Sequence, residues 1–372
     1  MHRAFNEFFK DCNTVRKIIL TTGGTGGHIF PALAVADCLQ KNWPDICLLF
    51  VGSQYGPEKR IVGLANIAFE GLPVRGILGR GIKSILALFM MLWSFIKALN
   101  IIRKFKPDAV IGFGGYASFA PMLAANIFKI PTILHEQNAI AGSSNKFLSK
   151  RVKKVCLSLP NTRGFLVEKC VLTGNPVRES IENLGTNIKI NNTKHLLILG
   201  GSQGAHALNM FLPTILPILK NEGIEVRHQT GLKDKEITSK AYEDVGYSKN
   251  DVVAFIDNIS ESYAWADIVL CRSGASTVAE LCAAALPSIL IPFPSAIHDH
   301  QNKNAEVLEQ NGAAIRIQES ELLSKDIAKI IIDLFKDREK LIAMSKAARK
   351  LAPLGAAKNV SNVLLDIINN NQ

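Results

Sequence analysis

Residues 17–28 have the sequence KIILTTGGTGGH, and residues 195–205 have the sequence HLLILGGSQGA. Each segment is an apolar strand that enters a glycine-rich loop at the start of a predicted helix. Such a loop places backbone N–H groups and a helix N-terminus against an anion. The two copies lie about half a chain apart, which predicts two similar α/β domains rather than a single nucleotide-binding fold.

Apolar strands alternate with helical patterns through the rest of the chain, which favours βαβ units and a parallel sheet in each half. The turn residues at 173–176 interrupt this alternation, so we expect the domain boundary there. Further strands are predicted at 46–51, 109–113, 132–135 and 155–157, and at 252–256, 268–271 and 288–292.

Composition also suits two domains, because 372 residues are too many for one ordinary core. The net charge of +11 favours an anionic partner, which leaves nucleic acid, an acidic membrane surface and a phosphorylated substrate open.

The seven cysteines are scattered without a C-x-x-C motif, and we expect them to be reduced. Residues 1–16 lack a continuous apolar region, so they are predicted to be an extension rather than a secretory signal.

Residues 84–96, SILALFMMLWSFI, carry no charge and follow Arg80 and Lys83. This stretch is shorter than the roughly 20 residues that span a bilayer. It suits a helix that lies in the membrane interface, with Arg80, Lys83, Phe89 and Trp93 on the lipid. A buried core helix is the alternative.

His28 stands at the mouth of the first glycine loop, where a side chain with an ordinary pKa of about 6.5 can accept a proton. A role in capping the helix is the alternative. The loop does not match the dinucleotide-binding pattern, because Ile29 occupies the place of the third glycine. A dehydrogenase is therefore disfavoured.

Four polar residues, His135-Glu136-Gln137-Asn138, follow the apolar strand residues 131–134. Open α/β sheets bind ligands at the carboxyl ends of their strands, so this quartet predicts a site, although a surface turn has similar composition. Glu136 is a second candidate base.

In the second half, the segment 272–277 leaves a strand and enters the helix that carries Glu280. Small residues at this helix start leave N–H groups for a diphosphate, and the Glu280 carboxylate can accept both hydroxyls of a ribose. The segment His298-Asp299-His300 is not expected to bind a metal, because its i, i+2 spacing directs the side chains apart.

Together these motifs resemble the MurG family of peptidoglycan N-acetylglucosaminyltransferases, over about residues 17 to 365. The matching motifs occur in the family's order at 23–28, 114–116, 135–138, 174–178, 200–205, 272–280 and 299–305. The resemblance implies a GT-B fold of two Rossmann-like domains facing a central cleft. Residues 17–174 would bind the acceptor and the membrane, residues 175–352 would bind the donor, and residues 353–372 would return as a helix to the first domain.

The implied reaction is the inverting transfer of N-acetylglucosamine from UDP-N-acetylglucosamine to the C4 hydroxyl of MurNAc in lipid I, which gives lipid II and UDP. The resemblance implies a peripheral enzyme on the cytoplasmic face of the bacterial inner membrane, with other cell-wall synthesis proteins as partners and no nucleic acid. No cofactor or metal ion is expected, because the nucleotide motifs contain no D-x-D.

Carried over by position, the resemblance implies a set of residues that bind UDP-N-acetylglucosamine. They are Thr25, Gly26, Gly27, Asn138, Arg178, Ser202, Ile256, Ala275, Ser276, Thr277, Val278, Ala279, Glu280 and Gln301. The neighbours of the first loop favour instead that it faces the diphosphate of the acceptor and the hydroxyl that attacks. We expect His28 to be the catalytic base, with Glu136 as the second choice. Sugar contacts are less defined, because Ser276 and residues 295–297 depart from some members.

Three alternatives to this function stay open. The chain resembles other GT-B enzymes, such as a diacylglycerol glycosyltransferase or a UDP-N-acetylglucosamine 2-epimerase. A non-catalytic membrane scaffold is a second alternative, which the retention of His28, Glu136 and both glycine loops disfavours. Nucleic-acid binding is a third, but the chain has no basic motif interleaved with aromatic residues.

Overall fold

The computed structural model describes residues 16–24, 26–74, 83–160, 162–186, 193–201, 204–296 and 299–370. The chain divides into two compact units, of which the first comprises residues 1–177 and 355–372 and the second comprises residues 178–354. The division falls between Val177 and Arg178. The sequence predicts the boundary a few residues earlier, near Gly174.

The first unit is a seven-stranded parallel sheet in the order β3-β2-β1-β4-β5-β6-β7. Its strands are β1 (Arg16–Thr21), β2 (Ile46–Ser53), β3 (Ala68–Leu72), β4 (Ala109–Gly112), β5 (Thr132–Glu136), β6 (Lys154–Leu157) and β7 (Cys170–Leu172). Its helices are α2 (Gly26–Asn42), α3 (Glu58–Leu64), α4 (Lys83–Phe105), α5 (Phe119–Ile127), α6 (Ser143–Ser149) and α16 (Ala356–Asn369), with the short 3₁₀ turn η1 (Val167–Lys169).

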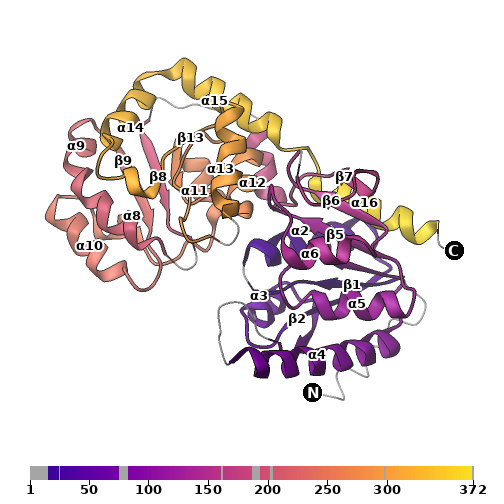
Figure 1. Ribbon diagram of the computed structural model, residues 1–372. Helices are drawn as coiled ribbons and strands as arrows, with labels where there is room; N and C mark the ends of the chain where they lie inside the picture. The colour runs from indigo at the N-terminus through magenta and orange to yellow at the C-terminus, as the bar shows by residue number, and fades with distance from the viewer. Residues whose placement is uncertain are drawn as a thin grey trace. The chain divides into compact units, whose positions relative to one another are not determined.

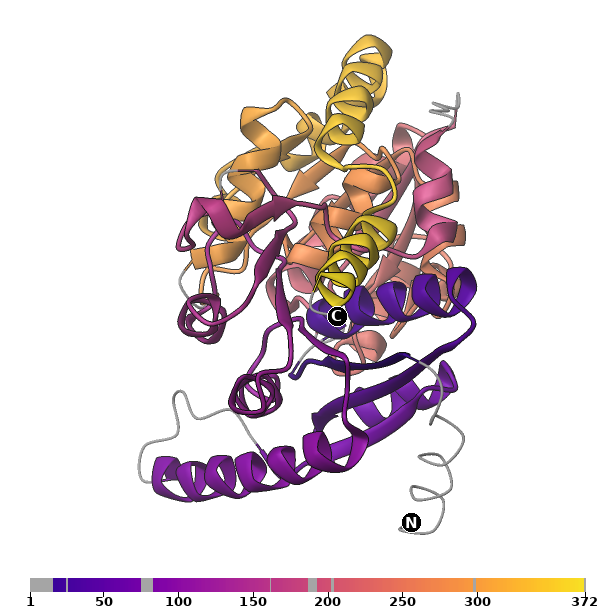
Figure 2. The ribbon, with the colours of Figure 1, turned by 90° about the vertical axis from the view of Figure 1, so that its right-hand side faces the viewer.

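Both faces of this sheet are buried, which explains why its strands are continuous apolar runs. Ile19 packs with α4, α5 and α6 on one face, and Ile18 and Leu20 pack with α2, α3 and α16 on the other. Figure 1 and Figure 2 show α4 along one side of the sheet and α2 beside α16 on the opposite side. The last helix of the chain is therefore part of the core of the first unit.

The second unit is a six-stranded parallel sheet in the order β10-β9-β8-β11-β12-β13. Its strands are β8 (His195–Leu199), β9 (Glu225–Gln229), β10 (Val252–Val253), β11 (Ile268–Cys271), β12 (Ser288–Leu290) and β13 (Ala314–Arg316). Its helices are α7 (Glu179–Glu182), α8 (His206–Phe211), α9 (Leu216–Asn221), α10 (Lys235–Asp244), α11 (Ile259–Trp265), α12 (Ala275–Ala283), α13 (His300–Gln310), α14 (Ile327–Lys336) and α15 (Arg338–Leu351). The 3₁₀ turns are η2 (Asn183–Thr186), η3 (Leu212–Thr214), η4 (Lys249–Asp251) and η6 (Glu319–Glu321).

One core of the second unit lies between its sheet and the helices α8, α9, α10, α14 and α15. Leu196 and Ile198 of β8 and Leu270 of β11 point into it. Helices α14 and α15 start at aspartates, Asp326 and Asp337, whose carboxylates accept backbone N–H groups of the first turn. These N-caps explain why two helices follow each other with a single residue between them.

Five cysteines are free thiols, as expected: Cys38, Cys156, Cys170, Cys271 and Cys282. The expectation is wrong for Cys47, which is disulfide-bonded. Within the described part of the chain, no helix is both long and apolar enough to cross a membrane.

Candidate functional site

The first candidate site lies at the carboxyl ends of the adjacent strands β1, β4 and β5. The loops that leave β1 and β4 pack directly on each other, because a Cβ atom on Gly115 would lie 1.9 Å from the carbonyl oxygen of Gly23. Gly24 and Gly115 also adopt positive φ angles of 108° and 79°, which L side chains rarely adopt. Gly24 and Gly115 thus suit their backbone conformation, and Gly115 also allows the two loops to approach each other closely.

His28 lies in the first turn of α2 and is half-buried. Its Nδ1 atom is 3.0 Å from the Oε1 atom of Gln137. The buried Gln137 amide nitrogen is 2.8 Å from the carbonyl oxygen of Phe113 and 3.2 Å from Nδ1 of His135. His28 is therefore tied to the residues that follow β4 and β5.

His135 is fully buried at the end of β5, and its Nε2 atom is 3.1 Å from the carbonyl oxygen of Gly174. Burial lowers the pKa of His135 to about 4, since desolvation disfavours the charged ring. The ring is therefore neutral near pH 7.

Glu136 is buried, and its two carboxylate oxygens accept four hydrogen bonds. Oε1 accepts from the backbone and side-chain nitrogens of Asn138, at 3.0 and 3.1 Å. Oε2 accepts from the backbone nitrogen of Gly142 at 3.0 Å and from Nδ2 of Asn145 at 2.9 Å. The geometry gives Glu136 the role of holding this loop in place, and Asn138 is one of the groups that it holds.

The second candidate site lies in the second unit, at the start of α12. Gly274, at the N-cap, supplies no side-chain cap, and Ala275, Ser276, Thr277 and Ala279 are half-buried. Val278 differs, because its side chain is buried in the core and its N–H group donates to the carbonyl oxygen of Gly274. An anion at this helix would therefore meet the residues before Val278.

Glu280 lies one turn further along α12 and is held by two neighbours. Tyr263 of α11 donates a hydrogen bond of 2.9 Å to its Oε2 atom, and Nη2 of Arg178 is 3.8 Å from its Oε1 atom. Burial raises the pKa of Glu280, whereas Tyr263 and Arg178 favour the charged carboxylate. The structure thus joins Arg178 and Glu280, two residues that the sequence predicts for the donor site.

Gln301 is brought to the same region by contacts between the starts of α12 and α13. The Ser273 hydroxyl donates to the backbone carbonyl oxygen of Gln301 at 2.8 Å, and the buried Asn304 amide donates to the carbonyl oxygen of Ser273 at 3.2 Å. The side-chain oxygen of Gln301 accepts from the N–H group of Phe293 at 3.0 Å. Its amide NH₂ group is therefore the part that can donate to a ligand.

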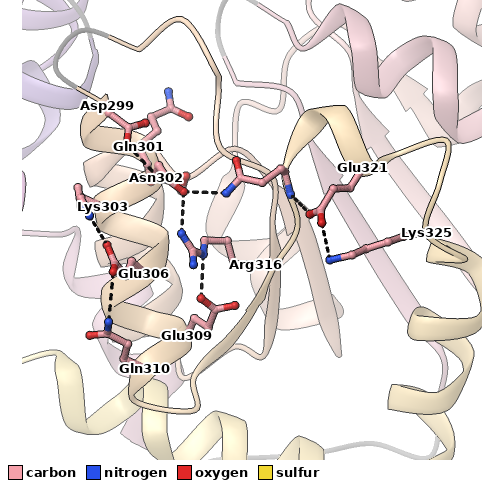
Figure 3. Close-up of polar contacts among 12 residues, drawn as sticks. Asp299, Gln301, Asn302, Lys303, Glu306, Glu309, Gln310, Arg316, Glu321 and Lys325 are labelled. Carbon is pink, nitrogen blue, oxygen red and sulfur yellow. Dashed lines mark hydrogen bonds and ion pairs between the residues drawn. The ribbon is translucent and has the colours of Figure 1, made fainter.

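A polar network supports the start of α13, as Figure 3 shows. Asp299 adopts a left-handed conformation with a φ angle of 55°, and its carboxylate accepts from the Asn302 amide at 3.0 Å. The Asn302 oxygen accepts from Arg316 at 2.8 Å and from Gln318 at 2.9 Å. These contacts fix the turn from which Gln301 projects.

The second glycine loop follows β8, and its described residues also pack tightly. Gly204 has a φ angle of 78°, and a Cβ atom there would lie 2.6 Å from the carbonyl oxygen of Thr230. The half-buried Ile256 follows β10, and its N–H group donates to the side-chain oxygen of Gln229 at 3.3 Å. The loops after β8, β9 and β10 therefore lie at one edge of the sheet.

Several of the predicted residues belong to segments outside the described ranges. Thr25, Arg80, Ser202 and His298 lie outside the described residues, and of Lys83 only its place in α4 is described. Gly26 and Gly27 are in the first turn of α2, next to His28. Within the described ranges, no three His, Cys, Asp or Glu side chains are grouped as metal ligands.

The apolar helix α4 has a buried part and an exposed part. Its last part is core, with Ala98, Ile102 and Phe105 buried. Further toward its start, Phe89 is 66% exposed and Trp93 is 63% exposed. Leu92 and Ile96 are exposed on the same helical face, which we call the α4 apolar face: Phe89, Leu92, Trp93 and Ile96.

Gln137 and Tyr263 touch candidate residues, but the sequence assigned neither of them a role. Gln137 belongs to the polar quartet at the end of β5 that predicts a site, so its position was a usable signal. Tyr263 lies 17 residues before Glu280, in a different helix. Nothing in the local pattern around Tyr263 indicates that contact.

Comparison with known proteins identifies the family. The glycosyltransferase family 28 N-terminal domain matches residues 18–157, and the family 28 C-terminal domain matches residues 195–360. A UDP-N-acetylglucosamine--N-acetylmuramyl-(pentapeptide) pyrophosphoryl-undecaprenol N-acetylglucosamine transferase of Nitratidesulfovibrio vulgaris (strain DP4) is 45% identical over 358 residues, covering 95% of this chain and 98% of that protein. The protein of the same name from Lawsonia intracellularis is 46% identical over 360 residues, covering 95% and 98%.

Solved structures agree with the sequence matches. Acinetobacter baumannii MurG has a TM-score of 0.74 and 33% identity, covering 94% of this chain and 99% of its own. The calicheamicin glycosyltransferase CalG4, at a TM-score of 0.69 and 14% identity, shares the fold. Both sheets, both glycine loops and the sequence matches lead to one assignment: the chain is a GT-B glycosyltransferase that belongs to glycosyltransferase family 28 and, within it, to the MurG family.

Proposed function

We propose that this chain transfers N-acetylglucosamine from UDP-N-acetylglucosamine to the C4 hydroxyl of MurNAc in lipid I, which gives lipid II and UDP. The observation that carries this proposal is that each unit presents a candidate site of its own. One unit presents the half-buried His28 beside a glycine loop, and the other presents Glu280 beside the start of α12. A histidine suits the activation of a hydroxyl, and a carboxylate near a helix N-terminus suits a nucleoside diphosphate.

In the proposed step, the His28 imidazole takes the proton of the C4 hydroxyl. The oxygen then bonds to the anomeric carbon of the donor sugar as the bond from that carbon to the diphosphate breaks. The electron pair of the broken bond leaves with UDP, and the configuration at the anomeric carbon inverts. His28 is favoured over Glu136 as the base, because all four hydrogen bonds described for Glu136 hold the following loop and the start of α6.

On the donor side, we propose that the ribose hydroxyls bind Glu280, that the sugar hydroxyls bind Gln301, and that the diphosphate lies at the start of α12 with Arg178 nearby. The dipole of α12 and the Arg178 charge favour a leaving anion. These groups make a divalent metal ion unnecessary in the proposal. Turnover that persists after dialysis against EDTA would support this point, and turnover that is lost and then restored by Mg²⁺ would contradict it.

We further propose that the enzyme is peripheral to the cytoplasmic face of the inner membrane, and that the α4 apolar face inserts into the lipid surface. Four large apolar side chains on one exposed helical face are suited to the interfacial region of a bilayer. The exposed Arg103 and Lys104 of the same helix, together with the net charge of +11, favour anionic headgroups. An acceptor with an undecaprenyl tail would then stay in the membrane during transfer.

The test is an incubation with labelled UDP-N-acetylglucosamine, with and without lipid I. Release of UDP that depends on lipid I, with label appearing in lipid II, is expected. Formation of an epimerised sugar nucleotide without acceptor would contradict the proposal and favour the epimerase alternative. A His28→Ala variant is expected to lose roughly 10²- to 10⁴-fold in kcat, the usual contribution of a general base. Near wild-type turnover with unchanged pH dependence would show that His28 is not the base.

A further inference from the structure

The Gln137 side chain joins the proposed base to the buried core of the first unit. It is buried, and its carboxamide contacts His28, Phe113 and His135. A carboxamide has one acceptor oxygen and two N–H donors, whereas a neutral imidazole has one donor and one acceptor. The hydrogen bonds of Gln137 therefore determine which ring nitrogen of His28 and of His135 carries the proton.

The orientation of the Gln137 amide follows from Phe113. The backbone carbonyl oxygen of Phe113 only accepts, so the group 2.8 Å from it must be the NH₂ group of Gln137. The reverse orientation would place two oxygens at this distance. The Oε1 atom of Gln137 therefore faces His28, 3.0 Å from its Nδ1 atom.

The second N–H group of Gln137 gives an independent check on this orientation of the amide. It lies 3.2 Å from Nδ1 of His135, which must then accept. The proton of the neutral His135 ring is consequently on Nε2, where the carbonyl oxygen of Gly174 accepts it at 3.1 Å. Every donor in the series meets an acceptor, and no step needs a charged ring.

We propose that Gln137 is a positioning residue that holds neutral His28 as the Nδ1–H tautomer, which leaves the lone pair on Nε2 to take the proton of the acceptor hydroxyl. The proposal rests on the proposed function only for the use of that lone pair. The tautomer itself is a property of the free protein. Fixing the tautomer and the ring plane of a general base is a recognised way of supporting proton transfer.

The direct test is a long-range ¹H–¹⁵N spectrum of full-length protein labelled with ¹⁵N-histidine, with the His28 signals identified by their loss in His28→Ala. We expect the Nδ1–H pattern for His28 and the Nε2–H pattern for His135. In Gln137→Met, the His28 signals should move toward a mixture of tautomers. An Nε2–H pattern for His28 in the unmodified protein would overturn the proposal, whatever the reaction is.

Asn209→Leu is the matched control, because Asn209 is also a fully buried carboxamide but lies in the second unit. Thermal unfolding of both variants shows whether each is folded. The control should leave the His28 signals unchanged. Equal movement of the His28 signals in Gln137→Met and Asn209→Leu would mean a general structural effect and would overturn the proposal.

Kinetics connect the tautomer to turnover. Gln137→Met should lower kcat on the order of 10- to 100-fold, a part of what a general base contributes, with little change in the KM for UDP-N-acetylglucosamine. In a His28→Ala background the same substitution should change kcat less than about twofold, because residues that act as a unit are not additive. A full additive loss in that background would overturn the proposal. If His28→Ala is itself fully active while the spectrum is as expected, the proposed base is wrong and the tautomer assignment stands.

Discussion

At the level of single residues, the Tyr263 hydroxyl makes the shorter of the two contacts that hold the Glu280 carboxylate. Tyr263→Phe removes the 2.9 Å hydrogen bond to the Glu280 carboxylate and leaves the ring in place. We expect the KM for UDP-N-acetylglucosamine to rise about 5- to 10-fold, since a hydrogen bond to a charged group contributes on the order of 1 kcal/mol or more. The measurement is the steady-state KM with kcat determined in parallel, and kcat should change less than KM.

Tyr247→Phe is the control for this prediction. It removes a tyrosine hydroxyl of the second unit that donates to the Ile224 carbonyl oxygen at 3.0 Å, away from the candidate site. Its KM should stay near the original value. An equal rise in KM for both variants would refute a specific role of Tyr263 at the donor site.

At the level of elements, α4 has a core part and an exposed part. Substitution of Phe89 and Trp93 by serine removes two large side chains from the α4 apolar face without touching the buried Ile102 and Phe105. We expect binding to vesicles that contain anionic phospholipid to fall at least about 10-fold, because burial of one such side chain in lipid contributes about 1.5–3 kcal/mol. Sedimentation with vesicles measures this.

Leu323→Ser serves as the comparison, since Leu323 is 90% exposed and belongs to the second unit. It should bind vesicles like the original protein. If the Phe89 and Trp93 variant also binds unchanged, then the α4 apolar face does not contact the membrane.

Helix α16 belongs to the core of the first unit, although it follows the whole second unit, residues 178–354, in the chain. Leu364 is fully buried in the cluster that α16 shares with α2. We expect Leu364→Ala to destabilise the first unit by about 3 kcal/mol, through lost burial and the cavity that remains. Leu354→Ala, at a 65% exposed position, should cost little, and urea unfolding measures both. Equal costs would contradict this packing.

At the level of the whole molecule, each unit contains one fully buried histidine with a lowered pKa among its described residues. Burial lowers the pKa of His135 to about 4 and that of His228 to about 3. An unfolded histidine has a pKa of about 6.5, so below that pH the unfolded state binds more protons and stability decreases as pH falls. The expected slope is at most about 1.4 kcal/mol per pH unit for each histidine, down to its folded pKa.

His228→Gln checks this pH dependence. Urea unfolding at pH 7 and pH 5 should show a smaller loss of stability in the second unit of the variant than in the original protein. Glu280, whose pKa is raised by burial, acts in the opposite direction and is present in both proteins, so it cancels from the comparison. An identical loss in both proteins would contradict a role for His228.

Several strands escaped prediction because they are short or carry polar residues. They are β3, β7, β9 and β13. In β9, EVRHQ, the exposed Glu225 and Arg227 alternate with buried residues, so the apolar run seen in the central strands is missing. Such strands form because a neighbouring strand of the sheet offers its backbone N–H and C=O groups for pairing. The local sequence pattern gives no information about that neighbour.

The sequence by itself determined the two parallel α/β sheets, the glycine loops and the family, because apolar runs, turn residues and motif order are local properties of the chain. The tertiary structure decided what individual side chains do. His28 and Gln137 are 109 residues apart, and Tyr263 and Glu280 are on different helices. Hydrogen bonds between such residues exist only after the sheets have brought strand ends and helix starts together. For the same reason, only the structure shows that Glu136 is enclosed by its loop and the start of α6, while His28 is half-buried.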